Sequence, residues 1–284
     1  MRWFLNEGGN ESGRYVHPFR FGAFVAAAVF TGMLTATSGL AQQTPPPVSQ
    51  APAAAAPQRP HLVEPPTDWP NMKRFHDADV ALPAAAAGEE RVVFMGDSIT
   101  ESWLHSGIPE AQRTAATDPG FFPGKPYVNR GISGQTTPQM LVRFRQDVVE
   151  LKPRVVVILA GINDVAGNTG DMTPEQTEDN FASMADLAHA NDIKVVLCSI
   201  LPAFDFPWKP GREPAPKVIA LNAWIKAYAA SHGYTYVDFY SAMVDSRGGL
   251  PATLSRDGVH PNKAGYDIMN PLVEAGIAKA LGRE

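Results

Sequence analysis

Two stretches, RVVFMGDSI at residues 91–99 and RVVVILAGIND at residues 154–164, decide the fold of this chain. Each starts with an apolar run rich in valine and ends in a glycine followed by polar side chains. An apolar run without polar alternation is typical of a strand that is covered on both faces, as in a parallel sheet. Both stretches therefore predict buried strands, at residues 91–95 and 154–160, that deliver polar residues to one edge of a parallel sheet.

The segments on either side alternate between apolar runs and helical spacing. Further strands are expected at residues 127–129, 194–199 and 235–239. Helices are expected at residues 101–105, 137–151, 173–190, 216–231 and 262–281. Repeated strand, helix, strand units predict an α/β domain, a three-layer α/β/α sandwich around a parallel sheet of about five strands.

The first part of the chain has a different composition. Arg14 and Arg20 precede an apolar stretch at residues 21–34, and small residues at 39–41 offer a cleavage site. This pattern is typical of a signal peptide, so we expect export to the periplasm or the cell exterior. The alternative is an N-terminal anchor at residues 21–41, although glycine, serine and threonine weaken this segment as a membrane span.

A linker and a folded domain are expected to follow. Residues 42–66 are rich in glutamine, proline and alanine, which is typical of an extended tether. We therefore predict a signal peptide or anchor at residues 1–41, a linker at 42–66 and one folded domain at 67–284. No stable membrane span is expected in the mature form, and the sequence makes no prediction about oligomeric state.

Charge and cysteine content narrow the functional classes. The formal net charge is −5, and no dense basic run is present, so we expect no nucleic-acid partner. The single cysteine, Cys198, excludes an intramolecular disulfide. Because Cys198 ends an apolar run, we interpret it as a small core residue and not as a reactive thiol.

Polar clusters follow the predicted strands. In parallel α/β sheets, ligands bind at the carboxyl ends of the strands, where the residues that follow each strand meet. We expect one shared edge for the four clusters, which are GDSI at 96–99, GISG at 131–134, GIND at 161–164 and DGVH at 257–260.

These clusters contain the parts needed for acyl transfer by a serine. Such a serine requires a base within hydrogen-bond reach and a group that orients the base. Ser98 follows a strand in a turn, and His260 is the histidine that lies in a loop near a carboxylate, Asp257. Taken alone, Ser98 is better explained as a helix N-cap, and the Asp257 and His260 pair as a loop-to-helix cap; only the four clusters together favour the catalytic interpretation.

Donors for a developing oxyanion are also present. Asn163 offers a side-chain amide, and Gly134 and Ser98 offer backbone N–H groups. The structural alternative for Asn163 and Gly134 is a polar turn at the end of a strand. Ser133 is a weaker rival nucleophile, because Gln135 stands where a GxSxG elbow requires its last glycine.

The four blocks GDSI, NRGISGQT (129–136), GIND and DGVHPN (257–262) together resemble those of the SGNH, or GDSL-type, hydrolases, in order and approximate spacing. The resemblance is nearest to bacterial relatives of platelet-activating-factor acetylhydrolase. It implies a flavodoxin-like catalytic domain and a serine esterase without metal or organic cofactor. By this resemblance Ser98 matches the nucleophile, Asp257 and His260 complete the triad, and Gly134 and Asn163 join Ser98 in the oxyanion hole.

The substrate and several other functions stay open at this point. An acetyl or other short acyl group on a glycan or small molecule suits an exported esterase, and a lysophospholipid or short-chain lipid ester is the alternative. The aromatic residues that could line such a site are Trp103, Phe204, Phe206 and Trp208. Three other classes are considered. A metallophosphoesterase would need more histidines and paired carboxylates at this edge, and a phosphate- or flavin-binding module is disfavoured by the acid Asp97 in the loop after the first strand. A carbohydrate-binding protein would leave the serine, histidine and aspartate pattern unused.

Overall fold

A computed structural model describes residues 68–118 and 120–283, so the predicted signal peptide, anchor and linker lie outside the described residues. Its sheet has five strands, all parallel, in the order β2-β1-β3-β4-β5. The strands are β1 (Val92–Gly96), β2 (Tyr127–Gly131), β3 (Val155–Leu159), β4 (Lys194–Cys198) and β5 (Thr235–Val237). The predicted parallel α/β sandwich is confirmed.

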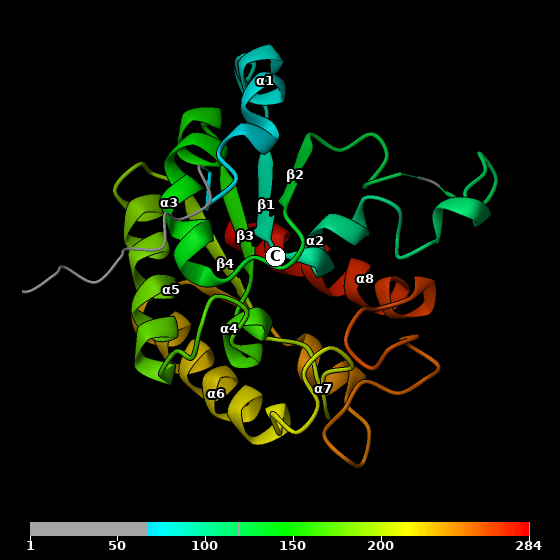
Figure 1. The fold of residues 1–284 in the computed structure, drawn as a ribbon. Helices are drawn as coiled ribbons and strands as arrows, with labels where there is room; N and C mark the ends of the chain where they lie inside the picture. The colour runs from blue at the N-terminus through cyan, green and yellow to red at the C-terminus, as the bar shows by residue number, and fades with distance from the viewer. Residues whose placement is uncertain (1–67, 119, 284) are drawn as a thin grey trace, which may run out of the picture. The chain divides into compact units, whose positions relative to one another are not determined.

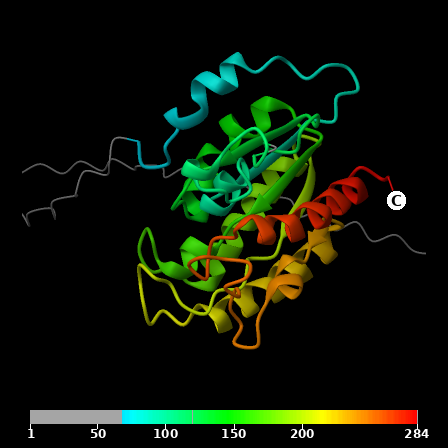
Figure 2. The ribbon, with the colours of Figure 1, turned by 90° about the vertical axis from the view of Figure 1, so that its right-hand side faces the viewer.

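Helices cover both faces of the sheet (Figure 1). One layer contains α3, α5 and α6, with α1 packed on α3 and α4 packed on α6, and the opposite layer contains α2, α7 and α8. The turned view in Figure 2 shows α8 crossing one face of the sheet. The helices are α1 (Lys73–Ala81), α2 (Ser98–Trp103), η1 (Glu110–Gln112), α3 (Thr137–Asp147), η2 (Val149–Leu151), α4 (Ile162–Ala166), α5 (Pro174–His189), α6 (Pro214–His232), α7 (Phe239–Met243) and α8 (Lys263–Ala280).

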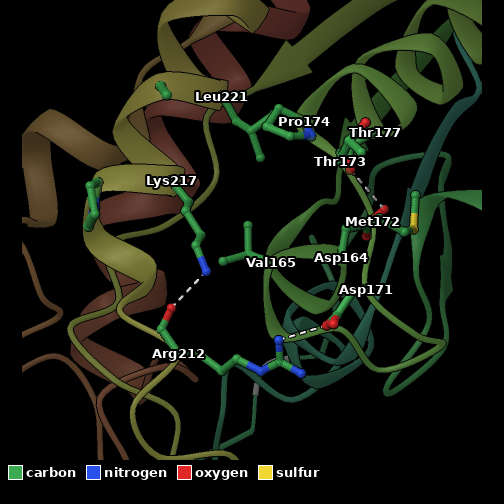
Figure 3. A pocket seen from close by; sticks show the side chains of 12 residues that line it. Asp164, Val165, Asp171, Met172, Thr173, Pro174, Thr177, Arg212, Lys217 and Leu221 are labelled. Atoms are coloured by element: carbon green, nitrogen blue, oxygen red, sulfur yellow. Dashed lines mark hydrogen bonds and ion pairs between the residues drawn. The ribbon is translucent and has the colours of Figure 1, made fainter.

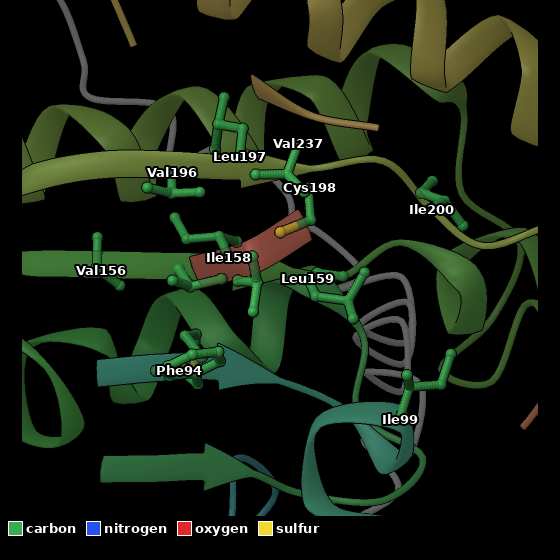
Figure 4. Close-up of a cluster of buried hydrophobic side chains, with 14 of the residues drawn as sticks. Phe94, Ile99, Val156, Ile158, Leu159, Val196, Leu197, Cys198, Ile200 and Val237 are labelled. Atoms are coloured by element: carbon green, nitrogen blue, oxygen red, sulfur yellow. The ribbon is translucent and has the colours of Figure 1, made fainter. Parts of the chain in front are cut away.

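The core lies along the central strands, because β1 and β3 are buried at every position. Their valine-rich sequences suit this place, since side chains alternate to opposite faces and both faces are covered by helices. Figure 4 shows Cys198 within this core, near Ile158 and Val237. Burial raises the pKa of the Cys198 thiol, which agrees with a structural residue.

The helices differ from the sequence expectations in three ways. The helix predicted at 101–105 is α2, which begins at Ser98 itself, and the helix predicted at 137–151 divides into α3 and η2. Helices α1, α4 and α7 were not predicted, because elements of five to nine residues carry little periodic signal. Within residues 68–118 and 120–283, no helix is both long enough and apolar enough to cross a membrane.

Candidate active site

Ser98 lies at the sharp turn between β1 and α2. Asp97 is the N-cap of this helix, and its Oδ1 accepts a hydrogen bond from the Ile99 amide at 2.9 Å. The capping role that we considered for Ser98 therefore belongs to Asp97. As the first residue of α2, Ser98 keeps its hydroxyl free for a partner outside the helix.

That partner is His260, from the loop before α8. The Ser98 Oγ lies 2.9 Å from His260 Nε2, and His260 Nδ1 lies 2.7 Å from Asp257 Oδ2. Burial raises the pKa of Asp257, but hydrogen bonds from His260 and Val259 outweigh it and hold that pKa well below the usual range. An ionised Asp257 only accepts hydrogen bonds, so Nδ1 carries the proton and Nε2 is left to accept from the Ser98 hydroxyl.

The hydrogen bond to Asp257 also favours the charged imidazole and raises the pKa of His260, against the effect of burial. Asp257 is fixed by its own loop, since its Oδ1 accepts from the amides of Val259 and His260 at 2.9 and 2.8 Å. Ser255 donates its hydroxyl to the His260 carbonyl at 2.7 Å. Local hydrogen bonds over six residues thus place both the imidazole and the carboxylate that orients it.

The backbone N–H groups of Ser98 and Gly134, both at this edge, have no acceptor among the described residues. Gly134 has φ +78°, the left-handed region that glycine adopts without strain, and it is exposed in the turn after β2. Both amides are therefore available to an oxygen that carries negative charge.

The third predicted donor, Asn163, lies on α4 and is 3% exposed. Its Nδ2 donates to the Gln135 carbonyl at 2.9 Å, and its Oδ1 accepts from Asn168 at 2.9 Å. These two bonds fix the orientation of the amide. One Nδ2 hydrogen binds Gln135 O and the second remains for another acceptor.

A buried arginine that the sequence analysis missed connects these parts. Arg143 on α3 is fully buried and pairs with Asp147 at 2.8 Å. It also donates to the Gly96 carbonyl at 3.0 Å and to Gln135 Oε1 at 2.6 Å. Arg143 therefore links the end of β1 to the loop whose carbonyl holds Asn163. Helical spacing alone could not reveal it, since a cation on an apolar face is not expected.

Other candidates have different partners. Ser133, the rival nucleophile, donates both its amide and its hydroxyl to Glu101. His105 is near Ser98 in sequence but lies 2.6 Å from Asp118. Within the described ranges, no group of three or more His, Cys, Asp or Glu side chains is arranged to hold a metal ion.

The buried Asp97 has one unsatisfied oxygen. Its Oδ2 has no hydrogen-bond partner in the described part of the chain, and burial raises the pKa of this carboxyl to about 7. The charge of His260 acts in the opposite direction and lowers it. Burial therefore favours the neutral carboxyl form of Asp97 more strongly than at an exposed site.

The predicted aromatic residues divide into two groups. Trp103 and Phe206 are core residues at 1% and 0% exposure, so they do not line a site as we considered. Phe204 and Trp208 are 52% and 42% exposed. The ring of Trp208 lies 6.0 Å from that of His260, measured between centroids, so one predicted aromatic residue is beside the imidazole.

A separate cavity of about 410 Å³ lies between α4, α5 and α6 (Figure 3). Asp164 contributes to its wall, and Arg212 and Asp171 form an ion pair at 2.7 Å beside it. Its lining contains none of Ser98, Gly134, Asn163, Asp257 and His260. Asn163 and Asp164 are adjacent on α4 but face different sites. Asp164 lines this cavity, whereas Asn163 donates to the loop after β2.

Comparison with known proteins gives consistent results. The model of the family described as "GDSL-like Lipase/Acylhydrolase family" matches residues 94–268. Esterase TesA of Pseudomonas aeruginosa is 32% identical over 182 residues, which cover 62% of this chain and 81% of that protein. An acetylxylan esterase of Geobacillus stearothermophilus is 29% identical over 204 residues, with coverage of 63% and 90%.

Solved structures agree with the sequence relatives. A GDSL-like lipase from Bacteroides thetaiotaomicron is 46% identical and superposes with a TM-score of 0.68. The match covers 74% of this chain and 98% of that one. The family resemblance predicted from the four sequence blocks is therefore confirmed, and the matched range contains Ser98 and His260.

Proposed function

Because the chain belongs to the GDSL-like lipase/acylhydrolase family, we propose that it cleaves short acyl esters through an acyl-enzyme formed on Ser98. The family and its named esterases establish the coarser point that the protein is a carboxylic ester hydrolase. The observation that carries the finer proposal is the continuous chain from Ser98 Oγ to His260 Nε2 and from His260 Nδ1 to Asp257.

In the proposed first step, Ser98 Oγ attacks the ester carbonyl carbon while His260 Nε2 takes the hydroxyl proton. The carbonyl oxygen becomes an oxyanion, which accepts hydrogen bonds from the amides of Ser98 and Gly134 and from Asn163 Nδ2. Asp257 remains ionised, keeps the imidazole oriented and stabilises its positive charge. The low pKa of Asp257 supports this role.

The tetrahedral intermediate then collapses. The carbon–oxygen bond to the alcohol breaks, and His260 gives its proton to the departing alcohol oxygen. Water next loses a proton to His260 and attacks the acyl carbon, and the acid leaves as the proton returns to Ser98. The second half-reaction uses the same donors and the same base, so one arrangement serves both steps.

An acetyl or similarly short acyl group on a glycan or small alcohol is the proposed substrate. The related acetylxylan esterase supports this choice, as does the predicted export of the chain. We also propose a periplasmic or extracellular location, supported by the signal-peptide pattern at residues 1–41. Mass spectrometry of the mature N-terminus tests the location, because an intact residue 1 in the cytosolic fraction would contradict it.

The test of the function is hydrolysis of p-nitrophenyl esters from acetate to octanoate. Ser98→Ala is expected to lower kcat by about 10⁴–10⁶-fold. Ser133→Ala is the matched control and should retain most activity, because Ser133 contacts Glu101 and not the base. Equal rates in the wild type and Ser98→Ala would contradict the proposal, and a preference for octanoate would instead favour a lipid ester.

A further inference from the structure

The loop between β4 and α6 brings an exposed indole to the base of the proposed mechanism. Trp208 is 42% exposed, and its ring is tilted by 38° to the imidazole of His260. Beneath it lies Phe206, which is fully buried and whose ring centroid is 5.2 Å from that of Trp208. Trp208 thus packs on the core through Phe206 and keeps much of its surface open.

Hydrogen bonds on both sides of Trp208 anchor this loop. Asp205 Oδ1 accepts from the amides of Phe206 and Gly211, at 2.9 and 3.0 Å. Lys209, next to Trp208, donates its ammonium group to the carbonyls of Ala166 and Gly167, at 3.1 and 2.6 Å. The indole is therefore positioned before a ligand arrives, which lowers the entropy cost of binding against it.

The contacts of Trp208 leave a polar group available. Its Nε1–H has no acceptor among the described residues, whereas the Nε1–H of the buried Trp103 donates to Asn270 at 2.7 Å. No described cation lies over the Trp208 ring, although Phe204 on the same loop has Arg247 at 5.1 Å from its centroid. An apolar surface with a free donor at its edge suits a ligand with a C–H face and oxygen atoms at its rim.

The proposed reaction indicates which part of the ester lies near Trp208. His260 must give its proton to the departing alcohol oxygen, so the alcohol lies within hydrogen-bond distance of Nε2 during that step. The carbonyl oxygen instead points to the donors of Ser98, Gly134 and Asn163. Trp208 is the aromatic ring beside this imidazole, so it is the candidate for contact with the alcohol part of the substrate.

We propose that Trp208 forms the alcohol subsite and stacks against the pyranose ring of a sugar whose hydroxyl carries the acyl group. The inference rests on the proposed esterase function and deepens it by naming the alcohol. A pyranose offers an apolar C–H face to the indole and hydroxyl oxygens to the indole N–H.

The kinetic test keeps the acyl group constant and changes the alcohol. Initial rates are measured for mono-O-acetylated methyl β-xylopyranoside, acetylcholine and ethyl acetate, with the wild type, Trp208→Ala and Phe204→Ala. Phe204→Ala is the matched control, because Phe204 is an exposed aromatic residue of the same loop without a ring contact to His260. Trp208→Ala should raise KM for the pyranoside about 3–10-fold and leave ethyl acetate unchanged.

Each other pattern overturns the assignment. An equal loss on the pyranoside and ethyl acetate would mean that Trp208 acts by holding the His260 ring. A dominant effect on acetylcholine would indicate a subsite for a quaternary ammonium group instead of a sugar. No effect on any ester, or the same effect from Phe204→Ala, would exclude Trp208 from the subsite.

A binding measurement separates this inference from the esterase proposal. Calorimetric titration of Ser98→Ala with the acetylated xylopyranoside does not depend on turnover. We expect Kd to rise about 3–10-fold when Trp208→Ala is added to Ser98→Ala. An unchanged Kd would overturn the subsite, whereas wild-type protein that binds the pyranoside through Trp208 but hydrolyses no ester would contradict the esterase proposal alone.

Discussion

The two halves of the candidate site are built in opposite ways. Ser98, Gly134 and Asn163 follow three different strands and are connected by buried contacts such as those of Arg143. Asp257 and His260 lie three residues apart in one loop, and their side chains are 38% and 33% exposed. The first set, which we call the nucleophile half after the proposed role of Ser98, is thus part of the fold. The second set, the base half, lies in one loop that is held by its own hydrogen bonds. Damage to the first should affect stability and catalysis together, and damage to the second should affect catalysis alone.

Asp257→Asn should have the largest effect and should spare the fold. An amide at this position can stabilise the wrong imidazole tautomer, so kcat is expected to fall about 10⁴-fold. The melting temperature should stay close to that of the wild type, because the carboxylate is partly exposed. Steady-state kinetics and calorimetry on the same sample test both statements, and a large fall in Tm would show that the base loop is also part of the fold.

Arg143→Met should have the opposite effect and weaken the fold first. The change leaves the Asp147 carboxylate buried without its cation and removes donors from the Gly96 carbonyl and Gln135. Breaking a buried ion pair in this way costs about 3–5 kcal/mol in the free energy of unfolding. Denaturant titration measures it, with the exposed Arg145→Met on the same helix as control.

If Arg143→Met proves as stable as Arg145→Met, the nucleophile half does not depend on this network. Activity measured below the unfolding transition gives a second readout. Loss of Arg143 frees Gln135, whose carbonyl holds Asn163, so kcat should fall more than KM changes.

Asn163→Ala tests whether Asn163 acts as an oxyanion donor in the nucleophile half. Removing one oxyanion donor typically lowers kcat by about 10²–10³-fold. Asn168→Ala is the comparison and should lose less activity, because Asn168 only supports two of the donors: its Nδ2 donates to Asn163 Oδ1 at 2.9 Å and to the Gly134 carbonyl at 3.3 Å. Comparable losses in both variants would indicate that Asn163 contributes through packing and not by contact with the substrate.

The pH profile tests the electrostatics of the base half. Protonated His260 cannot accept the serine proton, so kcat/KM should fall about tenfold per pH unit below the pKa of His260. The hydrogen bond from Asp257 raises that pKa, which places the midpoint above the ordinary histidine value of about 6.5. In Asp257→Asn the midpoint should move to lower pH.

Asp97→Asn is the control for this assignment, because the pKa of Asp97 is raised to about 7 by burial. If Asp97→Asn moves the midpoint and Asp257→Asn does not, the titrating group is Asp97. The fall of kcat/KM at low pH would then report the titration of Asp97 and not that of His260.

Sequence predicted the fold and the placement of the polar clusters because both depend on local patterns. Uninterrupted apolar runs identified the strands, and the rule that strand ends share one edge identified the clusters. The bounds of β3 differ from expectation by one residue at each end. Prediction was less successful where the deciding contact is distant in sequence.

Two features depend on such distant contacts, and a third depends on the exact position of a turn. The buried Arg143 is satisfied by Gly96 and Gln135, which periodicity in α3 cannot show. The assignment of Asp97 as the cap of α2 required the actual position of the turn. The contrast between buried Phe206 and exposed Trp208 depends on how the loop folds over the core, since both are aromatic residues in one short segment.

The central claim is that Ser98 is the nucleophile and that His260 activates it. Reaction with diethyl p-nitrophenyl phosphate, followed by release of p-nitrophenol and peptide mass spectrometry, tests this directly. We expect about one equivalent of p-nitrophenol per chain, a diethylphosphoryl adduct on the peptide containing Ser98, and much slower labelling of His260→Ala. An adduct on Ser133, or equal labelling rates in the wild type and His260→Ala, would contradict the account.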